Sequence, residues 1–136
     1  MKAALKGFSS IDIVEKLQDY QPIDKENFSF LGTFYVGEKD IEGEDNFDVF
    51  VCTPKWLLEN TQKDDVIFGR HYIIVSEYNY DTIYQALKKE IDSIEEDNWD
   101  KIGEKIGRIG HWEFEDYQEY PSQTKTNFIS RLLRRK

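Results

Sequence analysis

The sequence is poor in the residues that cross-link or interrupt a chain. It has one cysteine (Cys52), three prolines and eight glycines among 136 residues. A single cysteine rules out an internal disulfide, which is typical of a protein that folds in a reducing compartment. Few glycines and prolines, and no repeat or low-complexity stretch, indicate a chain that is ordered over most of its length.

Long apolar runs are also missing. The first residues, MKAALKGFSSIDIVEKL, contain no apolar core of signal-peptide length, and no later run is long enough to span a bilayer. We therefore expect a cytoplasmic protein that does not bind membranes.

The motifs of common catalytic and cofactor sites are absent. There is no G-x-S-x-G elbow, P-loop or G-x-G-x-x-G fingerprint. Cys52 could pair with His71 or His111, but it lies in an apolar run, where a cysteine usually acts as a small buried hydrophobe. Two histidines far apart in the sequence fit no zinc spacing, and residues 38–48 lack the EF-hand order. We expect no catalytic residue, cofactor or metal.

Acidic residues are what the chain has in excess. Asp and Glu number 27 against 18 Lys and Arg, which gives a net charge of -9. The end of the chain, RLLRRK at 131–136, carries four positive charges, and without them the net charge is -13. Such a body repels nucleic acid and anionic membranes and attracts basic partners. The same excess would also serve solubility alone.

The composition is that of one globular domain. Hydrophobic residues make up 39% and aromatic residues 15%, more aromatics than a disordered chain of this charge would carry. The length allows one sizeable core but not two. We expect a domain over residues 1–120 and a C-terminal extension over 121–136, which ends in a short basic helix.

Five segments before the C-terminal part of the domain have strand character or remain ambiguous. Residues 2–10, 28–37 and 47–53 are predicted as strands, the last two joined across a long acidic loop. Residues 70–78 have an apolar centre and are predicted as a central strand covered on both faces. Residues 11–20 fit either a helix or a loop.

Three segments have helical patterns. Residues 54–62 follow Thr53, which can cap a helix, and begin with Pro54, which suits the first helical position. Residues 81–97 and 98–110 carry apolar side chains at steps of three and four.

The fold class follows from these segments. The sequence predicts an α+β fold: a mostly antiparallel sheet of four to five strands, with two consecutive helices before the last strand. That last strand, which begins at His111, would place Glu113 and Glu115 on one face, with Tyr117 beside them if the strand runs that far. A pair of carboxylates can perform general acid–base chemistry, but a solvated face of an edge strand has the same pattern.

Several motifs resemble the Imm8 family of bacterial immunity proteins. They are FDVFVCTPKWLLEN at 47–60, HYIIVSEYNYDTI at 71–83, a helical Trp followed by GRIGHWEFEDY at 107–117, and the opening MKAALKGFSS with a downstream DYQP. Their order and spacing extend the resemblance to about Tyr120, and the residues after it match no family pattern. The resemblance implies a non-enzymatic protein that binds and neutralises a cognate toxin of a polymorphic toxin system, often a basic nuclease.

The carboxylate clusters are the expected contacts with such a toxin. The candidate residues are Glu42, Glu44, Asp45, Glu113, Glu115, Asp116 and Tyr117. They would mimic phosphate and plug the active site, or the protein would bind beside that site and block the substrate. The alternatives are a small enzyme that uses paired carboxylates, and an acidic adaptor or nucleic-acid mimic that binds a basic host protein. We expect a monomer or a weak homodimer.

Overall fold

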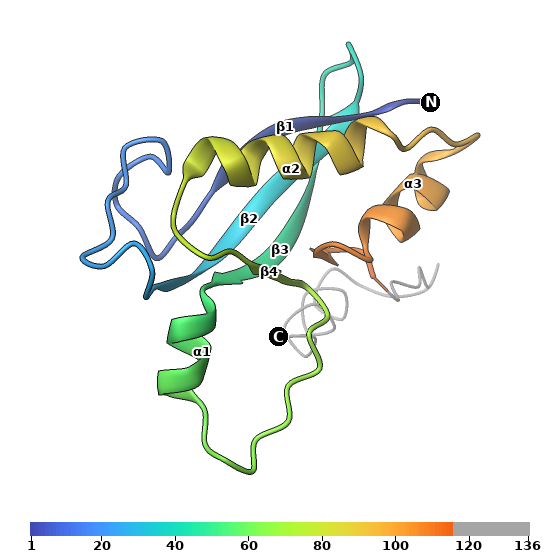
Figure 1. Cartoon of the computed structure of the whole chain (residues 1–136). Coiled ribbons are helices and arrows are strands. Elements are labelled where there is room, and N and C mark those ends of the chain that lie inside the picture. The colour runs from blue at the N-terminus through green and yellow to red at the C-terminus, as the bar shows by residue number, and fades with distance from the viewer. Residues whose placement is uncertain (116–136) are drawn as a thin grey trace, which may run out of the picture.

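A computed structural model describes residues 1–115, which form three helices and a five-stranded mixed sheet (Figure 1). The elements in chain order are β1 (Ala3–Ser9), β2 (Ser29–Glu38), β3 (Asp45–Cys52), α1 (Pro54–Asn60), β4 (Tyr72–Ile74), α2 (Tyr80–Asp92), α3 (Trp99–Ile106) and β5 (His111–Trp112). Asp116, Tyr117 and the predicted basic helix lie outside the described residues. The predicted α+β class, with two helices before the last strand, is confirmed.

The sheet is built around β3. Strands β1, β2 and β3 are consecutive and antiparallel, and the hairpin of β2 and β3 spans the predicted acidic loop. The other edge of β3 pairs with two strands in succession. Phe50 to Cys52 pair in parallel with β4, and Phe47 and Asp48 pair in antiparallel fashion with β5. The region around β5 is therefore held by β3 directly.

The core lies between the sheet and α2, which crosses one face of the strands (Figure 1). Apolar side chains spaced along α2 meet alternate side chains of β2 and β3, and α3 adds two more. These residues are Ile83, Leu87, Ile91, Phe34, Val36, Phe47, Val49, Val51, Ile102 and Ile106, all at most 3% exposed. Removing this apolar surface from water is the main force that fixes α2 and α3 against the sheet.

The helix boundaries confirm the predicted cap at Thr53. The Thr53 hydroxyl accepts a hydrogen bond from the Trp56 N–H at the start of α1, and Asn98 caps α3 in the same way. Helix α2 begins one residue earlier than predicted and is capped by Asn79. None of these helices is long and apolar enough to cross a membrane, as far as residues 1–115 are concerned.

The prediction of a central strand at 70–78 is wrong. The strand there is only β4, three residues at the end of the strand order, and the side chain of Ile74 is 53% exposed. A short apolar run does not reveal how many faces are covered. Residues 11–20, predicted as helix or loop, form turns and bends without helix, and only Leu17 is buried.

The prediction that the last strand continues past Trp112 is wrong over residues 113–115, and residues 116 and 117 lie outside the described part of the chain. The chain turns after Trp112, because the Glu115 N–H donates to the Trp112 carbonyl at 3.0 Å. Trp112 is buried, as a core-facing residue of the predicted strand would be. The turn removes the strand alternation from Glu113 and Glu115, so their positions depend on side-chain partners instead.

Candidate functional site: an acidic groove beside α3

The first predicted cluster lies on the loop between β2 and β3. Glu42 and Glu44 are exposed there, and neither carboxylate makes a hydrogen bond or ion pair to another residue within 1–115. The loop turns at Gly43, whose φ of 111° suits glycine. Both carboxylates are therefore available to a partner.

Asp45 has a different environment from its two neighbours. Its Oδ2 atom accepts hydrogen bonds from the Trp99 indole at 2.6 Å and from the Trp112 indole at 3.1 Å. Both interactions are partly buried. The carboxylate thus joins β3, α3 and β5, and this internal role was not visible in the sequence.

Glu113 lies next to Asp45, so the two predicted clusters meet in space. Its Oε1 atom accepts from the Asn46 N–H at 3.0 Å, and the Glu113 N–H donates to the Asn46 carbonyl. Burial raises the pKa of the Glu113 carboxyl, the Asn46 hydrogen bond lowers it, and the charges of Asp45 and Asp48 raise it further. The net shift is upward, chiefly because the carboxyl group is partly removed from water, with a smaller contribution from the two neighbouring negative charges.

Glu115 contacts Arg70 and His111 instead. It forms an ion pair with Arg70 at 2.6 Å, and the His111 ring lies 3.5 Å from its other oxygen. Glu113 and Glu115 therefore do not form the pair of carboxylates on one strand face that the sequence predicted.

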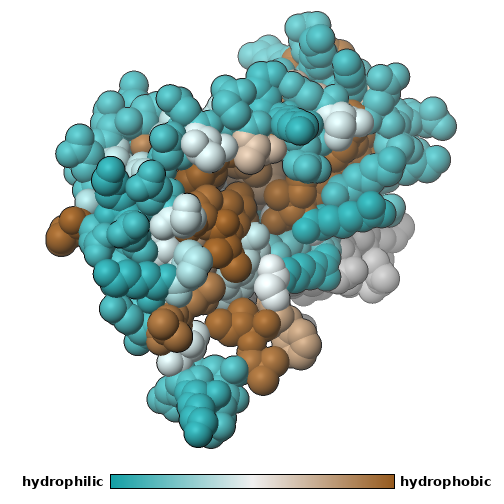
Figure 2. All heavy atoms as spheres, viewed as in Figure 1, coloured by the Kyte–Doolittle hydropathy of each residue, from teal (hydrophilic) through white to brown (hydrophobic). Residues whose placement is uncertain are grey.

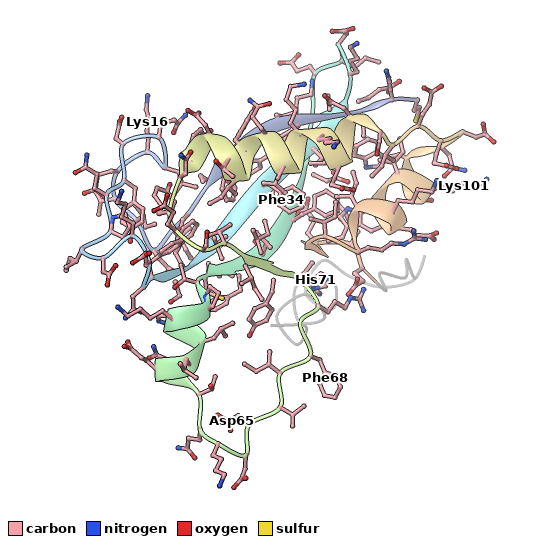
Figure 3. The ribbon with its side chains drawn as sticks, viewed as in Figure 1. Lys16, Phe34, Asp65, Phe68, His71 and Lys101 are labelled. Atoms are coloured by element: carbon pink, nitrogen blue, oxygen red, sulfur yellow. The ribbon has the colours of Figure 1, made fainter. Side chains whose placement is uncertain are left out.

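The two histidines, far apart in the sequence, are adjacent in the structure. The rings of His71 and His111 are 5.6 Å apart and nearly perpendicular. Nε2 of His71 lies 2.7 Å from the Gly107 carbonyl, a distance at which it donates, and this ties the segment before β4 to the end of α3 (Figure 3). Among residues 1–115 no group of three or more His, Cys, Asp or Glu side chains is placed to hold a metal ion.

A groove of about 880 Å³ opens beside α3. Aromatic rings and the glycine face of the helix form its floor, while charged side chains surround it. The lining residues are Trp99, Trp112, Phe114, Gly103, Gly107, Asp45, Asp100, Glu104, Glu115 and Arg70. Of the five charged residues that line the groove within residues 1–115, four are acidic, and the fifth, Arg70, is paired with Glu115.

Asp100 and Glu104 are the site residues that the sequence did not reveal. They are one turn apart on α3, both exposed, and both line the groove. The spacing was visible in the sequence, but many acidic pairs share it. Only the packing of α3 beside Trp112 distinguishes this pair from the rest.

Cys52 is unsuited to nucleophilic chemistry. Its side chain is fully buried, and burial raises the pKa of its thiol. A nucleophilic cysteine needs an accessible thiolate. The structure thus agrees with the interpretation of Cys52 as a small core residue.

A second exposed surface is apolar. Leu58 on α1 and Phe68 on the following loop are 81% and 86% exposed, and Val66, Ile67 and Ile74 add to them. Brown side chains mark apolar residues on the face shown in Figure 2, below α2, and Figure 3 shows Phe68 on the segment that leads to His71. An apolar surface of this kind is a common feature of interaction sites.

Comparison with known proteins shows to which class of protein the chain belongs. The family model described as Immunity protein 8 matches residues 3–117, so most of the chain is covered. The protein is an immunity protein of a toxin system. It belongs to the Immunity protein 8 (Imm8) family, as the sequence motifs indicated. No curated protein and no solved structure matched the chain.

Proposed function

We propose that this immunity protein neutralises a basic toxin domain by binding it through the acidic groove and the neighbouring loop, without catalysing a reaction. The observation that carries the proposal is the groove itself, where four carboxylates surround an aromatic floor. Aromatic rings supply contact area at a low cost in side-chain entropy, and carboxylates pair with Arg or Lys.

The accessible carboxylates favour a toxin whose own ligand is anionic. Glu42, Glu44, Asp100 and Glu104 are all exposed, whereas Asp45 and Glu115 are engaged internally. A nuclease active site is lined with cations that bind phosphate, so exposed carboxylates can take the place of that phosphate. We therefore propose that the immunity protein plugs the active site of the toxin and does not bind beside it. We also propose that the two proteins meet in the cytoplasm. The immunity protein would act there as a monomer or weak homodimer.

The enzyme alternative has lost its main support. Glu113 contacts Asn46 and does not line the groove, while Glu115 is paired with Arg70. The acidic adaptor remains an alternative because a basic host protein would fit the same surface. The identity of the captured partner separates these two hypotheses.

The test is affinity capture followed by kinetics. The tagged protein is incubated with lysate of its source bacterium at about 0.05 M and about 0.5 M NaCl, where the screening length falls to a few Å. The captured partner is then purified. Its association with the wild type is compared with that of Glu42→Lys/Glu44→Lys and Asp100→Lys/Glu104→Lys.

We expect each double variant to weaken binding roughly tenfold or more, mainly through the association rate, and to flatten its salt dependence. The matched control is Glu77→Lys/Glu90→Lys, which changes the net charge equally at exposed residues that do not line the groove. Equal affinity and salt dependence in all variants would rule out this surface. Capture of a basic host protein in place of a toxin would favour the adaptor.

A further inference from the structure

We propose that the C-terminal extension of the same chain, residues 121–136, binds the acidic groove when no toxin is present. The extension would then compete with the toxin, a consequence that rests on the proposed function. The binding itself depends only on the groove and on the sequence of the extension.

Charge complementarity is the first argument. Among the described residues, Asp45, Asp100 and Glu104 line the groove together with the ion pair of Glu115 and Arg70, so three carboxylates there are not balanced by a cation. The extension contains no acidic residue, and its cations are Lys125, Arg131, Arg134, Arg135 and Lys136. Arginine suits this contact, because its planar guanidinium pairs with carboxylates and also stacks on aromatic rings.

The apolar residues of the extension provide a second match. Phe128, Ile129, Leu132 and Leu133 alternate with the cations along the sequence. The groove has an aromatic floor beneath an acidic rim, formed by Trp99, Trp112 and Phe114. A segment with both basic and apolar side chains therefore fits this groove better than a purely basic one would.

The extension is attached to the domain close to the groove, which favours binding of the extension there. The described residues end at Glu115, which itself lines the groove. Fifteen residues lie between Glu115 and Arg131, and a random-coil chain of that length has an end-to-end distance of roughly 19–23 Å. Such a tether gives an effective concentration in the millimolar range, so even a weak interaction is substantially occupied.

Competition weakens the apparent affinity for the toxin, because the toxin binds only those molecules whose groove is free. The apparent dissociation constant is the intrinsic one divided by the fraction of such molecules. If the extension occupies half of the molecules, the apparent dissociation constant rises about twofold. Only partners that bind more strongly than the extension then displace it. The extension would thus protect the groove from weak basic ligands.

Paramagnetic relaxation in the full chain tests this without any toxin. Ser130→Cys is labelled with a nitroxide; Cys52 is fully buried and is not labelled in the folded protein. The indole N–H signals of Trp99 and Trp112 report on the groove, and Trp56 on α1 is the internal reference. We expect the groove signals to lose roughly half their intensity at about 0.05 M NaCl and to recover at about 0.5 M.

Two labelled controls separate binding from mere tethering. Arg131→Glu/Arg134→Glu/Arg135→Glu keeps the tether but reverses the charge, so the broadening should fall to a low, salt-independent value. Adding Asp100→Lys/Glu104→Lys to that variant should restore the salt-dependent broadening of the groove signals. Equal broadening in the wild type and the charge-reversed variant, or equal effects on all three indoles, would overturn the proposal. Neither result would bear on toxin binding, which the kinetic experiment tests separately.

Discussion

Asp45 is the residue at which three elements converge. One carboxylate oxygen accepts from the indoles of Trp99 on α3 and Trp112 on β5, while the backbone of Asp45 belongs to β3. A charged acceptor strengthens such hydrogen bonds relative to a neutral one. We interpret Asp45 as the residue that fixes the aromatic floor of the groove, with its charge adding to the field that faces a partner.

Asp45→Ala is predicted to lower the free energy of unfolding by about 2–4 kcal/mol, because two partly buried indole donors lose their acceptor. Asp45→Asn keeps an acceptor oxygen and should cost less. Urea unfolding followed by tryptophan fluorescence measures both. The control is Glu44→Ala, an exposed neighbour expected to change stability by less than about 0.5 kcal/mol. A similarly small effect of Asp45→Ala would contradict the structural role.

Helix α3 approaches β5 closely through one glycine. A Cβ atom added at Gly103 would lie 2.5 Å from two ring carbons of Trp112, whose side chain is only 8% exposed. The buried indole cannot swing into solvent without breaking its bond to Asp45. The absence of a side chain at Gly103 is therefore what lets the helix form one wall of the groove.

Gly103→Ala is predicted to destabilise the protein by about 1–2 kcal/mol, since overpacking outweighs the helical preference of alanine. Thermal unfolding measures the change, and Gly69→Ala is the matched control, because a Cβ there meets no atom within 4 Å. If Gly103→Ala were as stable as Gly69→Ala, or more stable, the close contact would have no energetic consequence.

Local sequence patterns predicted the elements that depend on local interactions. Thr53 was predicted to start a helix because its side chain reaches an amide two to three residues on, and the structure has this cap. Strands β4 and β5 were predicted too long, since their ends are set by contacts with the distant β3. A pattern of apolar residues carries no information about such distant partners.

The site was only partly predictable for the same reason. Exposure of Glu42 and Glu44 follows from an acidic turn, and the structure agrees. The bond from Asp45 to the indoles, the contact of His71 with His111 and the place of Asp100 in the groove all depend on the packing of α3 and β5. Asp116 and Tyr117 remain predictions.

The whole molecule is strongly acidic, and its described part has few ion pairs to offset the repulsion. Within residues 1–115, four Lys or Arg side chains form ion pairs with carboxylates, whereas this part of the chain holds 25 of the 27 acidic residues. These pairs are at least partly exposed, so each contributes little. Unbalanced charge destabilises the compact state through self-repulsion.

The midpoint of thermal unfolding is therefore predicted to rise by roughly 2–5 °C when NaCl is raised from about 0.02 M to about 0.2 M, because salt screens the repulsion. Calorimetry at pH 7 measures it. The less acidic Glu77→Lys/Glu90→Lys variant should show a smaller rise. A midpoint that stays constant or falls with added salt would show that self-repulsion does not limit stability.

The shared edge of β3 also determines when the groove can exist. The groove is complete only when β5 has paired with β3. The partners of β5, Phe47 and Asp48, lie more than sixty residues earlier in the sequence. Pairing across such a separation carries a high loop-closure cost and follows local structure in folding. During synthesis, which proceeds from the N-terminus at about 5–20 residues per second, the hairpin of β2 and β3 emerges well before Trp112. A nascent chain thus acquires its core strands early and its groove last, so only a finished molecule can present the complete surface.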